Sequence, residues 1–251
     1  MPAFDGARRF DGTVSLITGA SRGIGLAIAH RLVAEGGSVV ITGRRQEGLD
    51  AAIAELGDAA SAVAGRSDDA LHRAAVFAHI AERHGRLDHL VNNAGINPVY
   101  GPIVDVDADA ARKILEVNVV AALDWTRAAV AAGLSRSVVN IASVAGLGAS
   151  PGIAFYGISK AALINLTMQL AYELAPALRV NAVAPAVVKT AFARALYEGH
   201  EADASAAYPL QRLGEPDDIA GPVAFLLSED AAWITGHTLP IDGGAAIRPF
   251  L

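Results

Sequence analysis

Tyr156 and Lys160 lie four residues apart in an alanine-rich stretch of the sequence. If this stretch is helical, the two side chains share one face, because residues at that spacing are neighbours on a helix. An ammonium group beside a phenol favours the phenolate, so we expect the pKa of the phenol to fall from about 10. Such a phenol can give a proton to an oxygen or take one from it. By itself, the pair also suits an amphipathic helix whose lysine reaches to solvent.

Ser143 precedes Tyr156 by thirteen residues and follows the apolar run 137–141. A hydroxyl at the end of a strand can hold a carbonyl oxygen and stabilise the charge that develops on it. Together the three side chains predict acid–base chemistry on a carbon–oxygen bond. Tyr156 is then the general acid for reduction and the general base for oxidation.

A glycine-rich turn, Thr18-Gly19-Ala20-Ser21-Arg22-Gly23-Ile24-Gly25, follows the first apolar run. Glycine allows the backbone to turn sharply and to approach a pyrophosphate closely. The amide groups at the start of the next helix attract phosphates. A second apolar run follows at the spacing of a βαβ unit, which favours a dinucleotide site over a simple turn. Its predicted residues are Gly19, Ser21, Arg22, Gly23, Ile24 and Gly25.

The second predicted strand ends in Thr42-Gly43-Arg44-Arg45, without a carboxylate. NAD sites usually place an acidic residue there to hold the ribose hydroxyls. Arg44 can instead bind a 2′-phosphate through charge-assisted hydrogen bonds, and Arg22 can reach the same group from the glycine turn. Alternatively, Arg44 and Arg45 are solvated turn residues. The sequence favours NADP(H) over NAD(H).

Strand-like and helix-like segments alternate along the chain, which predicts an α/β fold. We expect strands at 14–18, 38–42, 60–64, 87–91, 137–141, 180–183 and 238–241, and helices at about 23–35, 46–56, 69–83, 107–132, 155–174 and 216–227. The expected architecture is a single-domain, Rossmann-like, doubly wound parallel sheet with helices on both faces, spanning residues 1–251. The irregular stretch 185–209 is predicted to be a mobile substrate lid.

Five ordered motifs between residues 11 and 244 resemble those of the short-chain dehydrogenase/reductase family. They are the glycine turn with its three-residue spacing, Asn92-Asn93-Ala94-Gly95, Asn118, Ser143 and Tyr156-x-x-x-Lys160. The resemblance implies that Lys160 binds the nicotinamide ribose and joins a proton relay. It also implies that Asn118 binds a water that connects Lys160 to solvent, although Asn118 alone would equally suit a bend in a helix.

The resemblance extends to further cofactor contacts. It implies that Asn92, Ala94 and Gly95 lie along the adenosine ribose and the cofactor backbone. The backbone of Val188 and the side chain of Thr190 would contact the carboxamide and a phosphate. Ala186 departs from the Pro-Gly that the family usually has here, and we expect it to stiffen the loop.

The predicted substrate pocket is mostly apolar and has no arginine clamp for a carboxylate or phosphate. Its expected lining is Ile96, Val144, Ala145, Leu147, Phe155, Val187, Phe192, Leu196 and Tyr197. A medium-sized apolar ketone, aldehyde or secondary alcohol fits this lining best. One alternative is a 3-oxoacyl-carrier-protein reductase, for which Arg127, Arg136 and Arg194 could contact the acidic carrier. The others are an NAD-dependent secondary alcohol dehydrogenase and a cofactor-binding regulatory protein without turnover.

Composition narrows the setting. The 251 residues include no cysteine, which excludes disulfides and thiolate chemistry. The net charge of −6 and the scattered basic residues argue against a nucleic-acid partner. The N-terminal stretch MPAFDGARRF lacks the apolar region of a signal peptide, and no apolar run is long enough to span a membrane. We expect a cytoplasmic enzyme without a metal, and the resemblance implies a homotetramer formed through helices 107–132 and 155–174 and the last strand.

Overall fold

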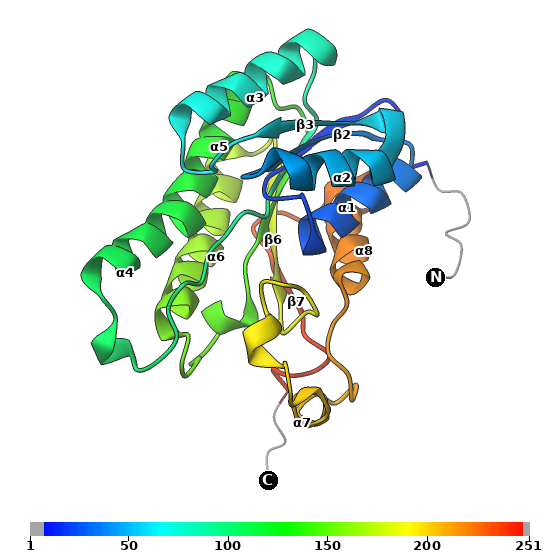
Figure 1. Cartoon of the computed structure of the whole chain (residues 1–251). Coiled ribbons are helices and arrows are strands. Elements are labelled where there is room, and N and C mark those ends of the chain that lie inside the picture. Colours follow the sequence, from blue (N-terminus) through cyan, green and yellow to red (C-terminus); the bar gives the residue numbers. More distant parts are fainter. Residues whose placement is uncertain (1–7, 248–251) are drawn as a thin grey trace.

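The computed structural model describes residues 8–247. Residues 1–7, which belong to the N-terminal stretch considered above for a signal peptide, and residues 248–251 lie outside the described part. The described strands form one seven-stranded parallel sheet in the order β3-β2-β1-β4-β5-β6-β7 (Figure 1). The strands are β1 Val14–Ile17, β2 Ser38–Gly43, β3 Ala60–Ala64, β4 His89–Asn92, β5 Ser137–Ile141, β6 Arg179–Pro185 and β7 Thr238–Ile241.

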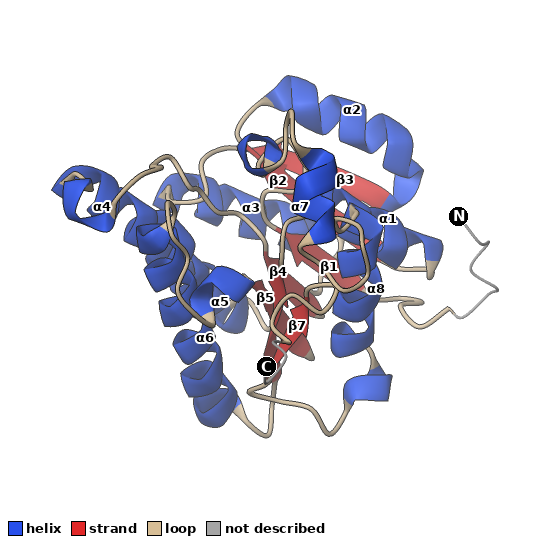
Figure 2. Cartoon of the chain, turned by 90° about the horizontal axis from the view of Figure 1, so that it is seen from below, coloured by secondary structure: helices blue, strands red, loops and turns tan. Residues whose placement is uncertain are grey.

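Helices cover both faces of this sheet (Figures 1 and 2). One face carries α1 Gly23–Ala34, α2 Gln46–Leu56 and α8 Pro216–Leu227, and the other carries α3 Ala70–Arg83, α4 Ala108–Leu115, α5 Ala121–Ala131 and α6 Ala154–Leu174. Successive strand residues point to opposite faces, so Leu16 and Ile17 enter two different cores. Because both faces are buried, apolar residues predominate in the strands. The predicted doubly wound fold is confirmed.

The strand order reverses direction at β1, which lies between β2 and β4. In open α/β sheets, ligands bind in the crevice at the carboxyl ends of the strands at such a point. The glycine-rich turn follows β1 and the Asn-Asn-Ala-Gly segment follows β4, so the topology brings both motifs to this crevice.

The structure differs from the prediction in the long helix 107–132. It divides this segment into α4, a π-helical turn at Glu116–Val120, and α5. Asn118 lies in the π turn and its side chain bonds Ile96 in the segment after β4. Turns of this kind occur where a side chain must be turned out of the regular helical register, often at functional sites.

The predicted lid also contains regular structure. Within residues 185–209 the chain forms a 3₁₀ turn at Arg194–Leu196 and a short helix, α7, at Glu201–Ala206. Elsewhere, no helix among residues 8–247 is both long and apolar enough to cross a membrane.

Candidate active site

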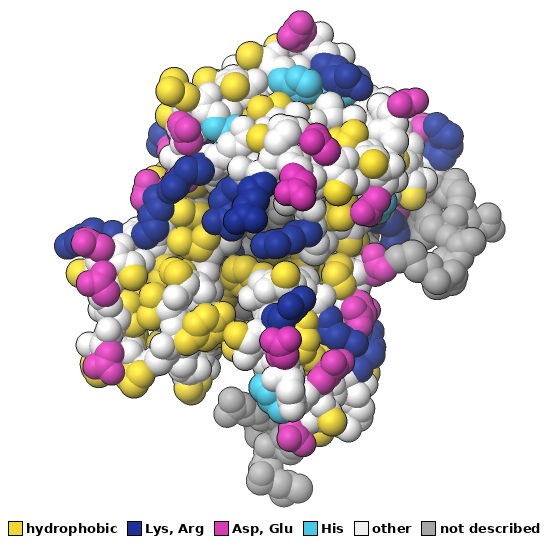
Figure 3. All heavy atoms as spheres, in the orientation of Figure 1, with side chains coloured by type: hydrophobic (Ala, Val, Ile, Leu, Met, Phe, Trp, Pro, Cys, Tyr) yellow, Lys and Arg dark blue, Asp and Glu magenta, His cyan; other side chains and the backbone are white. Residues whose placement is uncertain are grey.

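A cavity of about 1170 Å³ opens at the carboxyl ends of the strands. Segments that follow β1, β2, β3, β4, β5 and β6 line it, including part of the stretch 185–209. Figure 3 shows this face hollowed below a group of Lys and Arg side chains and beside hydrophobic ones. The cavity thus joins a basic end to an apolar end, and most of the predicted site residues line it.

The glycine turn is built by close contact between two strand ends. Gly19 has a positive φ of 65°, and a Cβ added there would lie 2.9 Å from the Cα of Ala94. Asn93 donates from Nδ2 to the carbonyl oxygens of Thr18 and Gly19, both at 2.9 Å. The Thr18 hydroxyl accepts from the amides of Asn93 and Ala94. Only glycine fits position 19, and the resulting cradle suits a pyrophosphate.

Asn92 lies elsewhere than predicted. It is buried, and its Nδ2 donates to Asn140 Oδ1 at 2.9 Å and to Thr126 Oγ1 at 3.1 Å, away from the cavity. Asn92 is the last residue of β4, and successive strand residues alternate in direction. The site residue is therefore Asn93, which lines the cavity. Gly25 also lies outside the lining, since it packs beneath Ala20 and Asn93.

The basic end of the cavity contains two arginines without partners. Arg22 and Arg44 line the cavity, are exposed, and make no side-chain hydrogen bond or ion pair with the described residues. Arg66 nearby is instead bound by both Asp68 oxygens, at 2.9 and 3.2 Å. A Cβ on Gly43 would lie 3.2 Å from Ser21 Cβ, so the glycine turn and the end of β2 touch. The residues after these two positions are Arg22 and Arg44.

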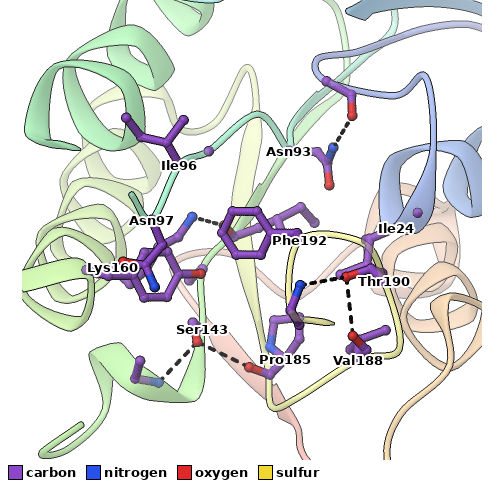
Figure 4. Close-up of a pocket in the computed structure, with 18 of the residues that line it drawn as sticks. Ile24, Asn93, Ile96, Asn97, Ser143, Lys160, Pro185, Val188, Thr190 and Phe192 are labelled. Atoms are coloured by element: carbon purple, nitrogen blue, oxygen red, sulfur yellow. Dashed lines mark hydrogen bonds between the residues drawn. The ribbon is translucent and has the colours of Figure 1, made fainter. Parts of the chain in front are cut away.

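Ser143, Tyr156 and Lys160 come together at the apolar end of the cavity. Ser143 and Lys160 are labelled there in Figure 4. Ser143 directly precedes the 3₁₀ turn Val144–Gly146. Its hydroxyl accepts from the Ala145 amide at 3.2 Å and donates to the Pro185 carbonyl at 3.4 Å. Lys160 is 3% exposed, and its Nζ donates to the Ile141 carbonyl at 2.7 Å. This Nζ lies 5.6 Å from the centre of the Tyr156 ring. The arrangement is that of a proton donor, a second hydroxyl and a buried cation.

The pKa of Tyr156 moves in the direction opposite to our expectation. Burial raises it to about 12, although the hydrogen bond with Ser143 opposes this increase. Burial also lowers the pKa of Lys160 to about 8. Removing these groups from water disfavours their charged forms more than the lysine favours phenolate. Tyr156 is therefore held protonated at neutral pH, as a proton donor requires.

Asn118 supports the site from behind. Its Oδ1 accepts from the Ile96 amide at 2.8 Å, and its Nδ2 donates to the Ile96 carbonyl and to Ser159 Oγ. A Cβ on Gly95 would lie 3.4 Å from Asn118 Oδ1 and 3.5 Å from Lys160 Nζ. Asn118 thus fixes the segment beside Lys160 but does not line the cavity, and its role in binding water remains a prediction.

Seven of the nine expected substrate-pocket residues line the cavity, namely Ile96, Val144, Ala145, Leu147, Val187, Phe192 and Leu196. Phe155 does not, because it precedes Tyr156 on a helix and points in another direction. Tyr197 also does not, since its hydroxyl turns to the Thr190 carbonyl. Sequence reasoning missed Tyr100, Tyr208 and Ala245, which the fold brings to the cavity from distant segments. The ring of Phe192 lies 6.1 Å from that of Tyr156.

Most of the remaining predicted cofactor-binding residues also lie at the cavity wall. Ser21, Gly23, Ile24, Gly95, Val188 and Thr190 all line the cavity. Gly23 has a positive φ and its Cα faces Thr190, so the glycine turn meets the loop after β6. Among residues 8–247, no group of three or more His, Asp and Glu side chains is arranged to hold a metal ion.

The strand order and the glycine turn at its switch point define a dinucleotide-binding α/β protein. Residues 19–246 match the family model described as enoyl-(acyl carrier protein) reductase. The chain is 42% identical over 247 residues to human dehydrogenase/reductase SDR family member 4, covering 94% of this chain and 88% of that protein. The Caenorhabditis elegans protein of the same name is 39% identical over 254 residues, covering 96% and 98%.

Solved structures agree with this assignment. A short-chain dehydrogenase/reductase from Brucella melitensis, titled glucose/ribitol dehydrogenase, superposes with a TM-score of 0.91 at 32% identity, covering 96% of this chain and 99% of that chain. One from Mycobacterium ulcerans gives a TM-score of 0.90 at 32% identity, covering 95% and 91%. The chain belongs to the short-chain dehydrogenase/reductase family of oxidoreductases, which use a nicotinamide cofactor.

Proposed function

We propose that this protein uses NADP(H) to reduce medium-sized apolar ketones or aldehydes and to oxidise the corresponding alcohols. The observation that carries the proposal is a single cavity that contains both the Ser143, Tyr156 and Lys160 cluster and the unpaired Arg22 and Arg44. The first group suits proton transfer to a carbonyl oxygen, and the second suits a 2′-phosphate.

The residues around the cavity fit a dinucleotide. The cradle at Gly19 would hold the pyrophosphate against the start of α1, and Arg22 and Arg44 would hold the 2′-phosphate. Ala94 and Gly95 would lie along the ribose. The backbone of Val188 and the side chain of Thr190 would face the carboxamide and a phosphate. When bound, the nicotinamide supplies the hydride for reduction and accepts it in oxidation.

The chain's own residues handle the proton. During reduction Tyr156 gives its phenolic proton to the substrate oxygen, while the carbonyl carbon receives the hydride. Ser143 donates a hydrogen bond to the same oxygen and stabilises its developing charge. Lys160, buried beside the phenol, stabilises the phenolate that remains. In oxidation, the phenolate removes the alcohol proton.

The apolar end supports the substrate class. Leu147, Val187, Phe192 and Leu196 line the cavity together with the catalytic cluster. Lys189 also lines it, but its ammonium group is paired with Glu201 at 3.0 Å and Glu215 at 2.8 Å. The carrier-protein alternative is less well supported, because Arg127 pairs with Asp124 at 2.9 Å and Arg136 with Glu229 at 2.7 Å. Of the three candidate carrier contacts, only Arg194 has no ion-pair partner among the described residues.

The test is turnover of NADPH and NADH, side by side, with a panel of apolar ketones. We expect NADPH to be preferred. Arg44→Ala should raise KM for NADPH about 10- to 100-fold and leave KM for NADH unchanged, since a hydrogen bond to a charged group contributes about 1.5–3 kcal/mol. Arg45→Ala is the matched control, because Arg45 is exposed but does not line the cavity.

Each other outcome selects an alternative. A preference for NADH would indicate an NAD-dependent alcohol dehydrogenase, and binding without turnover would indicate a regulatory protein. Activity confined to carrier-bound 3-oxoacyl groups would indicate the acyl-carrier-protein reductase. Activity confined to sugar phosphates or small keto acids would contradict the apolar substrate class.

A further inference from the structure

Backbone hydrogen bonds hold the loop after β6, residues 186–190, to β7 and to Gly214. The Ala186 amide donates to the Ile241 carbonyl at 3.1 Å. The Val187 carbonyl accepts from the Gly214 amide at 3.0 Å, and the Lys189 amide donates to the Gly214 carbonyl at 2.8 Å. Figure 4 shows Pro185, the last residue of β6, beside Ser143, and Val188 and Thr190 further along this loop. The loop therefore connects the catalytic cluster with the part of the cavity where the nicotinamide would lie.

One amide of this loop is held from the lid. The Val187 N–H donates to the hydroxyl oxygen of Tyr208 at 3.3 Å. Tyr208 stands 21 residues further along the chain, near the end of the lid, and lines the cavity. Since the carbonyl of Val187 is bonded to Gly214, this hydroxyl completes the pairing of its peptide groups.

The hydroxyl of Tyr208 is itself fixed in place. The Gln211 amide donates to the Tyr208 carbonyl at 2.8 Å, and the Leu210 amide donates to the Gly243 carbonyl at 3.2 Å. The tyrosine ring lies against Gly243, where an added Cβ would be 3.5 Å from Tyr208 Cδ1. A rigid ring anchored at its backbone presents its oxygen at a constant position.

A second cavity of about 150 Å³ also borders this loop, and its walls include Ala186, Val187 and Tyr208. Packing therefore does not by itself fix the loop, because a void leaves atoms on one side without contacts. Val187 and Tyr208 line both cavities, so the hydrogen bond between them would limit movement of the loop there.

We infer that Tyr208 is a positioning residue that holds the Val187 and Val188 backbone where it can receive the nicotinamide, and so couples the lid to the cofactor. This inference rests on the proposed function, in which the loop after β6 binds the carboxamide. Among residues 8–247, the Tyr208 hydroxyl has no hydrogen bond with Ser143, Tyr156 or Lys160. It acts through the Val187 amide, and its loss is expected to affect the nicotinamide end of the cofactor and not the adenosine end.

The experiment compares the wild type with Tyr208→Phe and with Tyr172→Phe. Tyr172 is 88% exposed on α6, so its change to phenylalanine removes a hydroxyl without touching the cavity. Dissociation constants are measured for NADPH and for 2′-phosphoadenosine diphosphate ribose, which lacks the nicotinamide. Thermal unfolding and the fluorescence of bound NADPH are recorded for each protein.

We expect Tyr208→Phe to weaken NADPH binding three- to tenfold and to change the emission of bound NADPH. Binding of the ligand without nicotinamide should stay within twofold of wild type, and Tyr172→Phe should resemble wild type throughout. Equal NADPH affinity and emission in Tyr208→Phe and wild type would overturn the inference. So would an equal loss for both ligands, which would indicate general damage to the fold. If the wild type binds neither ligand, the proposed function itself fails.

Discussion

At the scale of single residues, the proposed chemistry depends on two ionisable groups, Tyr156 and Lys160, that are buried away from water. Burial raises the pKa of Tyr156 to about 12 and lowers that of Lys160 to about 8. Below pH 8 the phenol therefore holds its proton and the lysine holds its charge. This is the protonation state that reduction requires, because the phenol must donate and the cation must stabilise what remains.

The pH dependence of the reaction should follow from these two values. The rate of reduction should be highest below about pH 8 and should fall as pH rises through the pKa of Lys160. The rate of alcohol oxidation should increase with pH, since it needs the phenolate. Initial rates in both directions, measured across the neutral and alkaline range, test this. A reduction rate that rises with pH through 8 would contradict the assignment.

The sequence could predict some residues of the site and not others. The spacing of Tyr156 and Lys160 places their side chains on one face of a helix. The glycines of the turn at Gly19 predict its sharp backbone conformation. The choice between Asn92 and Asn93 depends on where β4 ends, which local sequence determines poorly. The pKa of Tyr156 depends on burial among distant segments such as the one that carries Phe192.

At the scale of elements, the site depends on a close contact between the turn Val144–Gly146 and α6. A Cβ on Gly146 would lie 2.7 Å from the Ala161 amide nitrogen and 2.7 Å from the carbonyl carbon of Lys160. The glycine lets the turn that follows Ser143 rest directly on the helix that carries Tyr156 and Lys160. The geometry of the cluster is thus set by the separation of two backbones.

Gly146→Ala should therefore damage catalysis. The added methyl forces the turn and α6 apart, which should cost about 1–3 kcal/mol of stability and lower kcat at least about tenfold through misplacement of Ser143. Gly148→Ala is the control, because nothing lies within 4 Å of a Cβ there. Thermal unfolding and steady-state kinetics of both variants measure the effect. An unchanged kcat in Gly146→Ala would show that the contact does not position the cluster.

Most elements could be predicted from the sequence, because apolar runs and the glycines between them mark the strands and turns. The predicted bounds of α2, β3, β5, α8 and β7 agree with the structure residue for residue. The π turn at Glu116–Val120 could not be predicted, since its cause is the hydrogen bonding of Asn118 to a segment 22 residues away. The helix α7 could not be predicted either, because it is only six residues long and lacks a periodic apolar face.

At the scale of the whole molecule, one edge of the sheet collects the functional segments while two cores hold the sheet in place. Several large apolar side chains are exposed on the outer surface. Trp233, just before β7, is 100% exposed, and Ile158 and Met168 of α6 are 46% and 44% exposed. Val120, just before α5, is 49% exposed, and Val130, within α5, is 40% exposed. Where such side chains form a contiguous patch, they favour association with another protein surface.

We propose that copies of the chain cover these surfaces in a homotetramer. Light scattering should give a mass of about four times 25.7 kDa. Trp233→Glu should dissociate the assembly at least in part, because a charge in a dry interface lacks a partner. A monomer mass for the wild-type protein would refute the proposal. A stable dimer would limit association to one surface, either that of α5 and α6 or that around Trp233.

The measurement that tests the central claim most directly is the rate of NADPH oxidation with an apolar ketone in the wild type and in Tyr156→Phe. The variant keeps the ring and loses only the phenolic hydroxyl, so it should bind NADPH as the wild type does. We predict that its kcat falls about 10²- to 10⁴-fold, the usual contribution of a positioned general acid. Equal rates in the two proteins would contradict the assignment of Tyr156 as the proton donor and the mechanism built on it.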